Sequence, residues 1–377
     1  MRRREFMKKA GLGLAAVASA SVVPSAVRSQ ESGLPTIKWR LASSFPRNLD
    51  VIYIGAEVLA KRVLELTGGK FEIRVFPAGE IVPPNGILAA VQKNNVECGH
   101  TCSYYYHGQN KAFSLDTAIP FGLDARQMNA WHYYGDGLAL SREFFAKYNI
   151  VNFSGGNTGT QMGGWFKKEI KRLKDIRGLK IRIPGFGAEI FAALGAVVQR
   201  DLASADIYPA FARGALDAAE LVGPYDDEKQ GLYKVARFYY YPGWWEPEGR
   251  ITFYVSKVQW DQLPGSYQAA FEAAAAEVDV RMLANYDAWN PLAIRRLVQK
   301  GIQLRRFPDD VLKAAHKMAE KIYTVESDRN PDFKKIYDSI CAFQKASDTW
   351  MGMAENTLAN FMQTQLLTRE RKKAARP

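Results

Sequence analysis

An arginine interrupts an apolar strand pattern at residues 179–184, which read Leu-Lys-Ile-Arg-Ile-Pro. Arg182 comes just before Pro184 and Gly185, where the strand pattern ends. A guanidinium at the end of a strand that faces a cleft can bind a carboxylate through two parallel hydrogen bonds. A surface arginine or an internal ion pair fits the same residues, so this segment alone leaves all three interpretations open.

Two glutamates stand in apolar surroundings. Glu220 lies in a run that predicts a strand over residues 218–222, and Glu246 follows the aromatic run 239–245. A buried carboxylate needs a cationic or hydrogen-bonding partner, so Glu220 is expected in an ion pair or as a metal ligand. Two carboxylates, an amide oxygen and a backbone carbonyl would form a hard oxygen site for Na⁺ or Ca²⁺.

The segment 157–166, Asn-Thr-Gly-Thr-Gln-Met-Gly-Gly-Trp-Phe, supplies two amides. Asn157 and Gln161 stand beside glycines, which allow a ligand to approach the backbone closely. We therefore treat residues 157–246 as the segment most informative about function.

Motifs of common enzymes are absent from the sequence. It contains no G-x-S-x-G, no H-E-x-x-H and no G-x-x-x-x-G-K-[ST]. None of the four histidines stands in a nucleophile–base context. These observations favour a binding protein without covalent chemistry. The alternative of another class is an exported hydrolase with Glu220 and Glu246 as its acid and base, because carboxylate pairs support glycoside hydrolysis.

Three cysteines give no complete disulfide framework. Cys98 and Cys102, with His100 and His107, resemble half of a zinc site, but the remaining histidines lie far away in the sequence. The run 96–106 is better interpreted as a buried strand and turn in which cysteine acts as a small hydrophobic residue.

The net charge of +12 is concentrated at the two ends of the chain. The first 29 residues contribute +5 and the last ten contribute +4, which leaves +3 for the 338 residues between them. The body is therefore close to charge balance, which argues against a nucleic-acid partner.

The N-terminus has the pattern of an export signal. Residues 3–8, Arg-Arg-Glu-Phe-Met-Lys, fit the twin-arginine pattern R-R-x-F-x-K, and a small, apolar run follows at 11–23. We expect a twin-arginine signal peptide at residues 1–29, with cleavage after Ala26 or Ser29, and a mature chain in the periplasm. A cytosolic N-terminal helix is the alternative.

Strand and helix patterns alternate through the first part of the body, which predicts a largely parallel sheet covered by helices. Asp50 is expected to cap the helical pattern that ends at Gly68-Gly69. A second lobe is expected from about residue 161, and the long strands at 237–241 and 251–255 are expected to run between lobes. The strands are predicted at 36–42, 71–76, 96–103, 150–153, 161–166, 179–183 and 218–222, and the helices at 51–66, 85–94, 128–148, 188–194 and 204–213.

The chain is almost wholly helical after Asp261, with helices predicted at 263–298, 309–326 and 331–367. These helices are interpreted as a brace across both lobes and as a possible dimer surface. Two α/β lobes joined by more than one segment leave a cleft between them, where small ligands bind.

The sequence resembles the solute-binding receptors of tripartite ATP-independent periplasmic (TRAP) transporters, the DctP-like family, over essentially the whole mature chain. The motif L-K-I-R-I-P at 179–184 is shared broadly in that family. The longer segments 39–46, 156–166, 222–229 and 240–246 resemble the branch that receives 2-oxo or 2-hydroxy monocarboxylates together with a metal cation.

The resemblance implies roles for individual residues. Arg182 would pair with the ligand carboxylate, Asn157 would hydrogen-bond the ligand, and Tyr104 and Phe45 would close over it. Related sequences often carry an aromatic residue where this chain has Leu221, so the pocket wall would be roomier. The implied ligand-binding set is Arg182, Asn157, Tyr104, Phe45, Gln161 and Trp245, and the implied set for Na⁺ or Ca²⁺ is Gln161, Glu220, the carbonyl of Leu221, and Glu246.

The resemblance also implies a two-lobe periplasmic binding-protein fold of the α/β class with interlobe strands and long C-terminal helices. Lobe I would comprise 36–156 and 246–288, lobe II 157–245 and 289–330, and the C-terminal helix and basic tail 331–377. The partners would be a small carboxylate, the TRAP membrane subunits and, through the C-terminal helices, a second copy of the chain. A receptor for a dicarboxylate, sugar acid or polyol is the alternative within this class.

Overall fold

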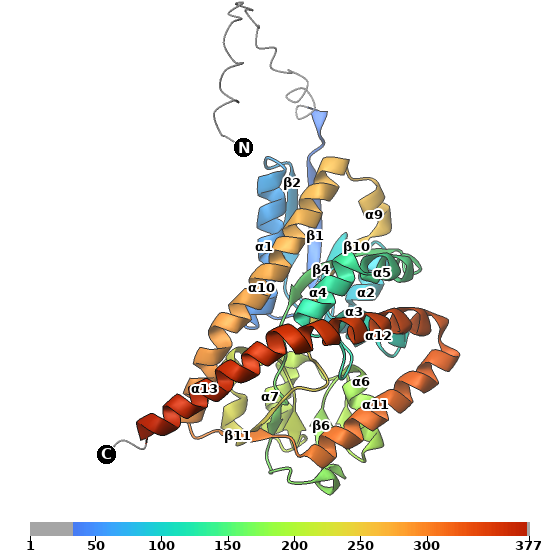
Figure 1. Ribbon diagram of the computed structural model, residues 1–377. Helices are drawn as coiled ribbons and strands as arrows, with labels where there is room; N and C mark the ends of the chain where they lie inside the picture. The colour runs from blue at the N-terminus through green and yellow to red at the C-terminus, as the bar shows by residue number, and fades with distance from the viewer. Residues whose placement is uncertain (1–32, 375–377) are drawn as a thin grey trace, which may run out of the picture. The chain divides into compact units, whose positions relative to one another are not determined.

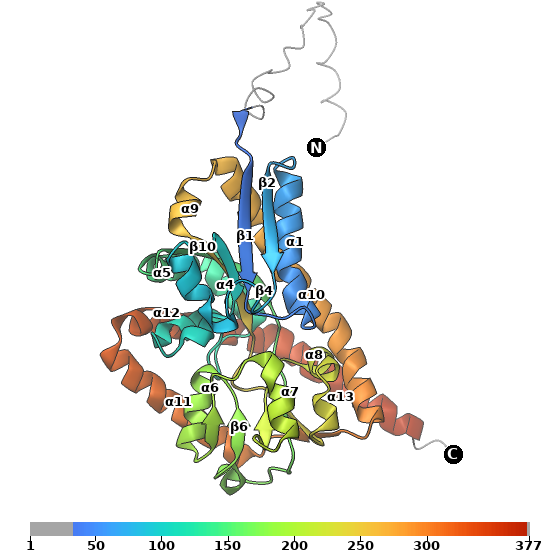
Figure 2. The same ribbon diagram turned by 180° about the vertical axis from the view of Figure 1, so that it is seen from behind.

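Two mixed β-sheets flanked by helices organise the chain in the computed structural model (Figures 1 and 2). The structure describes residues 33–374, with side chains described through residue 368. The predicted signal peptide at 1–29 lies outside the described residues. The described residues from Ile37 onward form one compact unit, and all elements below belong to it.

The first sheet has five strands in the order β2-β1-β3-β10-β4. Strands β2 and β3 lie parallel to β1, whereas β10 runs antiparallel to β3 and β4. The alternating pattern of β1 buries Trp39 and Leu41, and the rings of Trp39 and of Phe71 on β2 pack edge to face. The bounds are β1 Ile37–Ser43, β2 Phe71–Phe76, β3 Cys98–Thr101, β4 Ile150–Asn157 and β10 Arg250–Ser256.

The second sheet has six shorter strands in the order β11-β9-β5-β8-β6-β7. Strand β6 lies parallel to β7 and β8, and β9 lies parallel to β11, whereas β5 runs antiparallel to β8 and β9. The buried rings of Trp165 and Tyr239 stack 4.1 Å apart across β5 and β9. The bounds are β5 Trp165–Phe166, β6 Lys180–Arg182, β7 Val197–Gln199, β8 Ala218–Ala219, β9 Phe238–Tyr241 and β11 Gln303–Arg306.

Nine α-helices of the described chain, α1 to α9, come before the long C-terminal helices. Helix α1 packs against β2, α2 against β3 and α5 against β4, while α6 and α7 pack in the second sheet's half. Their bounds are α1 Asp50–Leu66, α2 Ile87–Gln92, α3 Ser114–Thr117, α4 Ala125–Tyr134, α5 Gly137–Ala146, α6 Gly185–Ala193, α7 Ser204–Ala212, α8 Pro224–Lys229 and α9 Lys257–Asp261.

Four long helices form the C-terminal part, where the sequence predicts three, because the helix predicted at 331–367 is divided by a π-helical turn at Gly352–Asn356. They are α10 Gly265–Gln299, α11 Asp309–Arg329, α12 Pro331–Met351 and α13 Thr357–Ala374. Helix α10 packs against α1 and β4 of the first half and against α8 of the second. Helix α12 packs against α5 and α11, and α11 packs against α6, so these helices brace both halves of the fold (Figure 1).

Several predicted elements differ from the structure. The expected cap at Asp50 is wrong: Leu49 is the N-cap residue, and Asp50 is the first helical residue. Its carboxylate instead accepts hydrogen bonds from Tyr225 and Lys229, across to α8. The helix predicted at 128–148 is two helices, because the chain breaks between α4 and α5 at Gly135.

The strands predicted to run between lobes each belong to one sheet. Strand β9 pairs only within the second sheet and β10 only within the first, and residues 242–249 connect them. The predicted strand at 218–222 ends at Ala219, so Glu220 lies just beyond β8 rather than inside it. The lobe boundaries given above remain a prediction.

No described helix is both long and apolar enough to cross a membrane.

Candidate functional site

Two adjoining cavities lie where strands of both sheets end. The carboxyl ends of β1 and β3 lead to Phe45 and Cys102, and those of β6 and β8 lead to Arg182 and Leu221, all of which line the inner cavity. Side chains that follow strand ends commonly form ligand sites in α/β folds. The inner cavity holds about 20 Å³ and the outer one about 180 Å³. Tyr104, Tyr105, Arg182 and Ser204 line both cavities.

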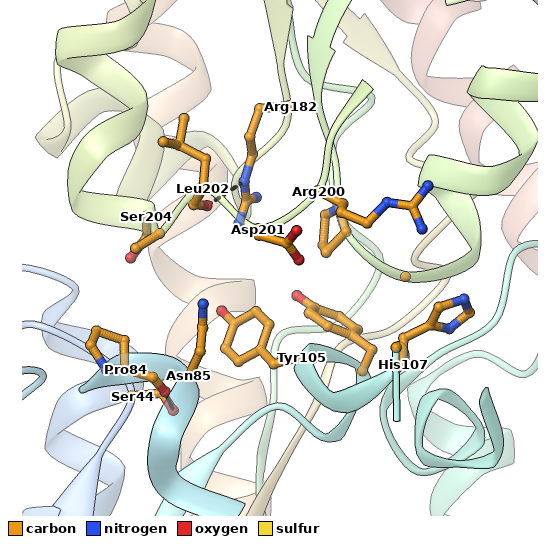
Figure 3. A pocket seen from close by; sticks show the side chains of 15 residues that line it. Ser44, Pro84, Asn85, Tyr105, His107, Arg182, Arg200, Asp201, Leu202 and Ser204 are labelled. Carbon is orange, nitrogen blue, oxygen red and sulfur yellow. Dashed lines mark hydrogen bonds between the residues drawn. The ribbon is translucent and has the colours of Figure 1, made fainter. Parts of the chain in front are cut away.

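Arg182 is the last residue of β6, and its side chain is buried between the two cavities. Its Nε donates to the backbone oxygen of Leu202 at 3.1 Å (Figure 3). Its Nη1 donates to the backbone oxygen of Glu220 at 3.3 Å and forms an ion pair with the Glu220 carboxylate. The sequence left open a surface arginine, an internal ion pair and an anion site, and the structure excludes the first.

Backbone hydrogen bonds join the three segments that carry the predicted cation ligands. The Gln161 N–H donates to the Glu246 carbonyl at 3.1 Å, and the Met162 N–H donates to the Val222 carbonyl at 3.2 Å. The segment at Gln161 therefore lies between the segment of Glu246 and that of Leu221. A Cβ at Gly249 would lie 2.7 Å from both Gln161 Nε2 and Thr158 Oγ1, so a larger residue there would displace these side chains.

The oxygens predicted to bind a cation are buried without partners in the described part of the chain. They are one carboxylate oxygen of Glu220 (Oε2), one of Glu246 (Oε2) and the amide oxygen of Gln161 (Oε1). A buried oxygen without a hydrogen-bond donor costs about 1–3 kcal/mol. A carboxylate or amide oxygen of this kind is the ligand that a hard cation prefers, so the chemistry of these residues fits the implied Na⁺ or Ca²⁺.

The raised pKa values of the two carboxyl groups also favour a bound cation. Burial raises the pKa of Glu220 to about 7, although the Arg182 guanidinium opposes the shift. Burial also raises the pKa of Glu246 well above its usual range; the charge of Glu220 adds to this, and a Tyr104 hydrogen bond opposes it. Two buried carboxylates that repel one another are stabilised by a nearby cation.

A carboxylate that the sequence analysis gave no role holds the Leu221 segment in place. Asp227 accepts hydrogen bonds from Trp165 Nε1 at 2.8 Å and from the Tyr239 hydroxyl at 2.7 Å. Its other oxygen accepts from the Val222 N–H at 3.2 Å, next to Leu221. Burial raises the pKa of Asp227 to about 6, against these hydrogen bonds. The pair Asp226-Asp227 directly after Pro224-Tyr225 is the signal that could have indicated it.

The other predicted ligand residues divide into two groups. Phe45 lines the inner cavity and Tyr104 lines both, as expected for residues that close over a ligand. Asn157 and Trp245 line neither cavity. The Asn157 amide nitrogen donates to Glu248 and its oxygen accepts from Gly159 N–H at 2.9 Å. The Trp245 ring packs against Phe191, Phe307 and Trp244.

A buried polar network behind the site also escaped the sequence analysis. Asp116 accepts hydrogen bonds from Ser103 at 2.6 Å and Thr252 at 2.7 Å, and it pairs with the buried Arg250 at 3.2 Å. These residues come from distant parts of the sequence and carry no common motif. The network fixes the loop after β3, which presents Tyr104 and Tyr105 to the cavities.

An ion-pair cluster connects the two halves at the edge of the outer cavity. His107 follows the tyrosines of the first half, and its Nε2 lies 2.9 Å from the carboxylate of Glu189 on α6. Lys111 Nζ lies 2.7 Å from the same carboxylate. Burial would raise the pKa of Glu189, but these hydrogen bonds lower it to about 2.

The cysteines behave as small buried residues rather than as part of a bridge. Cys98 and Cys102 are free and buried, and burial raises the pKa of both thiols well above the usual range. Among the described residues, no group of three or more His, Cys, Asp or Glu side chains is placed to hold a metal ion. The predicted cation set has two carboxylates and depends on amide and backbone oxygens for the remaining ligands.

The fold and the site belong to a known class of protein. Residues 42–328 match the DctP family model, described as bacterial extracellular solute-binding protein, family 7. The chain belongs to this family, which comprises receptors of TRAP transporters rather than enzymes.

Individual relatives are similar over almost their whole length. A monocarboxylate 2-oxoacid-binding periplasmic protein of Nostoc sp. PCC 7120 is 45% identical over 361 residues, covering 96% of this chain and 99% of the relative.

Two solved TRAP solute-binding proteins are also similar. One from Bordetella bronchiseptica, a dimer with copurified calcium and picolinate, is 49% identical with a TM-score of 0.87, covering 89% of this chain and 99% of that one. One from Pseudoalteromonas atlantica, with bound sodium and pyruvate, is 33% identical with a TM-score of 0.83, covering 86% and 99%.

Proposed function

We propose that this chain is the periplasmic receptor of a TRAP transporter and that it captures a small 2-oxo or 2-hydroxy monocarboxylate, such as pyruvate, together with Na⁺ or Ca²⁺. The observation that carries the proposal is that the buried Arg182 pairs with Glu220, while one oxygen each of Glu220, Glu246 and Gln161 is buried without a partner among the described residues. The names of the Nostoc, Bordetella and Pseudoalteromonas relatives support both the ligand class and the cation.

Arg182 would bind the ligand carboxylate, and Gln161, Glu220, Glu246 and the Leu221 carbonyl would hold the cation. When bound, the cation supplies a positive charge that attracts the ligand carboxylate and its 2-oxygen. Chelation through two adjacent oxygens favours acids substituted at carbon 2. Asn157 and Trp245 remain proposed ligand residues, and contact with a ligand requires the Asn157 amide to leave Glu248.

The charges of the site favour a monoanion over a dianion. One guanidinium faces two buried carboxylates. With a divalent cation and a monocarboxylate bound, these charges cancel, whereas a dicarboxylate would leave an excess negative charge in a buried site. Among the described residues, Arg182 is the only cationic side chain that lines the inner cavity, and Arg200 lines only the outer one, so no second cation deep in the site balances it. The exported hydrolase is not supported, because the family comprises binding proteins.

Ligand entry requires the cavity walls to move. The inner cavity of about 20 Å³ holds little more than one water molecule or ion, whereas a 2-oxo acid is several times larger. Tyr104, Tyr105, Arg182 and Ser204 separate the inner from the outer cavity. We infer that these residues part when the two halves separate and close again over the ligand, in a form that the membrane subunits recognise.

Calorimetry of the purified full chain tests this proposal. Pyruvate is titrated in calcium buffer, and succinate is the competing dicarboxylate. Arg182→Leu should abolish pyruvate binding, whereas the matched control Arg213→Leu, at an exposed position after α7, should retain it. Unchanged pyruvate affinity in Arg182→Leu, or tighter binding of succinate than of pyruvate, would contradict the proposal. Elemental analysis of the protein as purified identifies the retained cation.

We also propose export by the twin-arginine pathway, supported by residues 3–8. Replacing Arg3 and Arg4 together by lysine should retain the precursor in the cytoplasm, as measured by cell fractionation. Export that continues unchanged would point to a different pathway.

A homodimer through the C-terminal helices is supported by exposed apolar side chains. Leu358, Phe361 and Met362 are spaced i, i+3 and i+4 on α13, and more than half of each is exposed. The Bordetella relative is described as a dimer. Leu358→Glu combined with Phe361→Glu should shift the full chain from dimer to monomer in light scattering. A wild-type chain that is monomeric at micromolar concentration would contradict this assignment.

A further inference from the structure

The residue assigned to the carboxylate and a residue assigned to the cation are bonded to one another. Arg182 contacts Glu220 twice, at the carboxylate oxygen Oε1 and at the backbone oxygen. The Glu220 N–H donates back to the Arg182 carbonyl at 3.2 Å, beside the pairing of β6 with β8. The side chains are 4% and 1% exposed, so water screens their attraction very little.

The Glu220 carboxylate can therefore pair with Arg182 or bind the metal cation. Its Oε1 is paired with Arg182, while its Oε2 lies buried without a partner, as does Oε2 of Glu246. Glu246 has no ion pair with Arg182 among the described contacts, although its charge is close enough to affect Arg182. The two glutamates thus differ in one respect: only Glu220 holds the guanidinium.

We propose that the Arg182–Glu220 ion pair couples the two halves of the site, so that a cation on Glu220 loosens the pair and frees the Arg182 guanidinium for the carboxylate. This inference rests on the proposed function and goes beyond it, because it makes one contact of this chain responsible for the cation dependence of acid binding. By linkage, a carboxylate that takes Arg182 away from Glu220 must strengthen cation binding by the same factor.

The alternative is simple charge screening, in which the cation only offsets the repulsion between the two glutamates and the ligand. In that case either glutamate could be neutralised with the same effect on acid binding. The two interpretations therefore make different predictions for Glu220→Gln and for its matched control Glu246→Gln, since each removes one buried carboxylate but only the first releases Arg182.

Calorimetry with pyruvate tests the coupling, in choline buffer after treatment with chelator and again with calcium. Wild-type affinity should fall about tenfold or more without calcium, within the usual range of coupling between sites. Glu220→Gln should lose this calcium dependence, bind pyruvate more weakly than wild type in calcium, and bind it at least about fivefold more tightly than wild type without calcium. Glu246→Gln should lose the dependence without tightening to the same extent.

A second measurement follows the reciprocal effect and does not depend on the stability of the glutamate variants. Calcium is titrated without any acid, with tryptophan fluorescence as the readout. Arg182→Lys keeps the positive charge but loses the forked contact with Glu220. It should bind calcium at least about threefold more tightly than wild type.

Each result decides the proposal. Equal calcium-free pyruvate affinities in Glu220→Gln and Glu246→Gln would establish screening and overturn the coupling. Weaker calcium-free binding in Glu220→Gln than in wild type would show that Glu220 positions Arg182 instead of competing for it, and unchanged calcium affinity in Arg182→Lys would likewise refute it. Wild-type protein that binds no pyruvate in calcium would instead remove the proposed function itself.

Discussion

The ion pair between Arg182 and Glu220 predicts a large loss in the free energy of unfolding when only one of the two side chains is replaced. Arg182→Met removes the guanidinium that pairs with the Glu220 carboxylate. That carboxylate is 1% exposed, so it stays buried without a positive partner. Removing one member of a buried ion pair costs about 3–5 kcal/mol. We expect the lower end, about 3 kcal/mol, because Glu220 can bind a proton: burial already raises its pKa to about 7 with Arg182 present.

The double variant Arg182→Met/Glu220→Gln removes the uncompensated charge together with the guanidinium. Replacing both partners of a buried pair is often close to neutral, so we expect a loss of about 1 kcal/mol or less. The coupling energy is the loss in the double variant minus the losses in both single variants, so its magnitude should be at least about 2 kcal/mol, toward the upper end of the range for contacting residues.

The pH dependence has a defined sign. A carboxyl group whose pKa is raised in the folded state stabilises the fold below its unfolded pKa, and this contribution is lost as pH rises through the folded value. Without Arg182, the pKa of Glu220 should rise further. The deficit of Arg182→Met against wild type should therefore shrink as pH falls from 8 to 5.

Chemical unfolding followed by circular dichroism, in calcium-free buffer, measures all four proteins of the cycle. The linear extrapolation gives each free energy of unfolding, provided that the slopes agree. Additive losses in the double variant would refute the reasoning, because they would mean that the two side chains contribute independently. A deficit of Arg182→Met that grows toward low pH would refute it as well.

Three further predictions concern neighbouring contacts. Gly249→Ala should weaken calcium binding about tenfold in calorimetry, because a Cβ would lie 2.7 Å from the Gln161 amide nitrogen; unchanged affinity would remove Gln161 from the cation site. Asp227→Ala should lower the unfolding free energy by about 3 kcal/mol and weaken calcium binding, because it leaves three buried donors unpaired; a stable variant with normal calcium affinity would contradict this. Glu189→Gln should cost about 1 kcal/mol at neutral pH in chemical unfolding, since Glu189 is still partly exposed and partly screened. Its lowered pKa of about 2 stabilises the fold above pH 4.5, and this contribution is lost as pH falls toward 2; a difference from wild type that persists at pH 2.5 would argue against the contact with His107.

The sequence predicted the first sheet well because its strands have a regular alternation. In β1 and β2, apolar residues alternate with exposed charged residues over 37–41 and 71–75, so the period alone defines them. Strands β5 and β8, predicted as longer strands at 161–166 and 218–222, have only two residues each, and β11, which was not predicted, has a single apolar residue among its four. Such short strands exist because their neighbours pair with them, which no local pattern records.

The candidate site was predictable in part because a charged residue stands out in an apolar run. Arg182 and Glu220 were conspicuous because a charge in an apolar run demands an explanation. The role of Tyr105 and Ser204 in lining the cavities depends on how distant loops meet, and Asp227 is significant only through its contacts with Trp165 and Val222. Residues of this kind become visible only once the tertiary structure is known.

Helix α10 determines where the two sheets can separate. Asp279 on this helix accepts a hydrogen bond from Ser154 of β4 at 2.6 Å, and Tyr286, about 10 Å further along, donates to Asp226 of α8 at 2.6 Å. A continuous helix bonded to both halves over so short a distance acts as a pivot. Opening is therefore smallest beside α10, and beside the brace of α11 and α12, and larger at the rim of the outer cavity, between Asn85 and Asp201 (Figure 3). The distance between spin labels placed across that rim should change strongly when the receptor opens, whereas the distance between labels along α10 should hardly change.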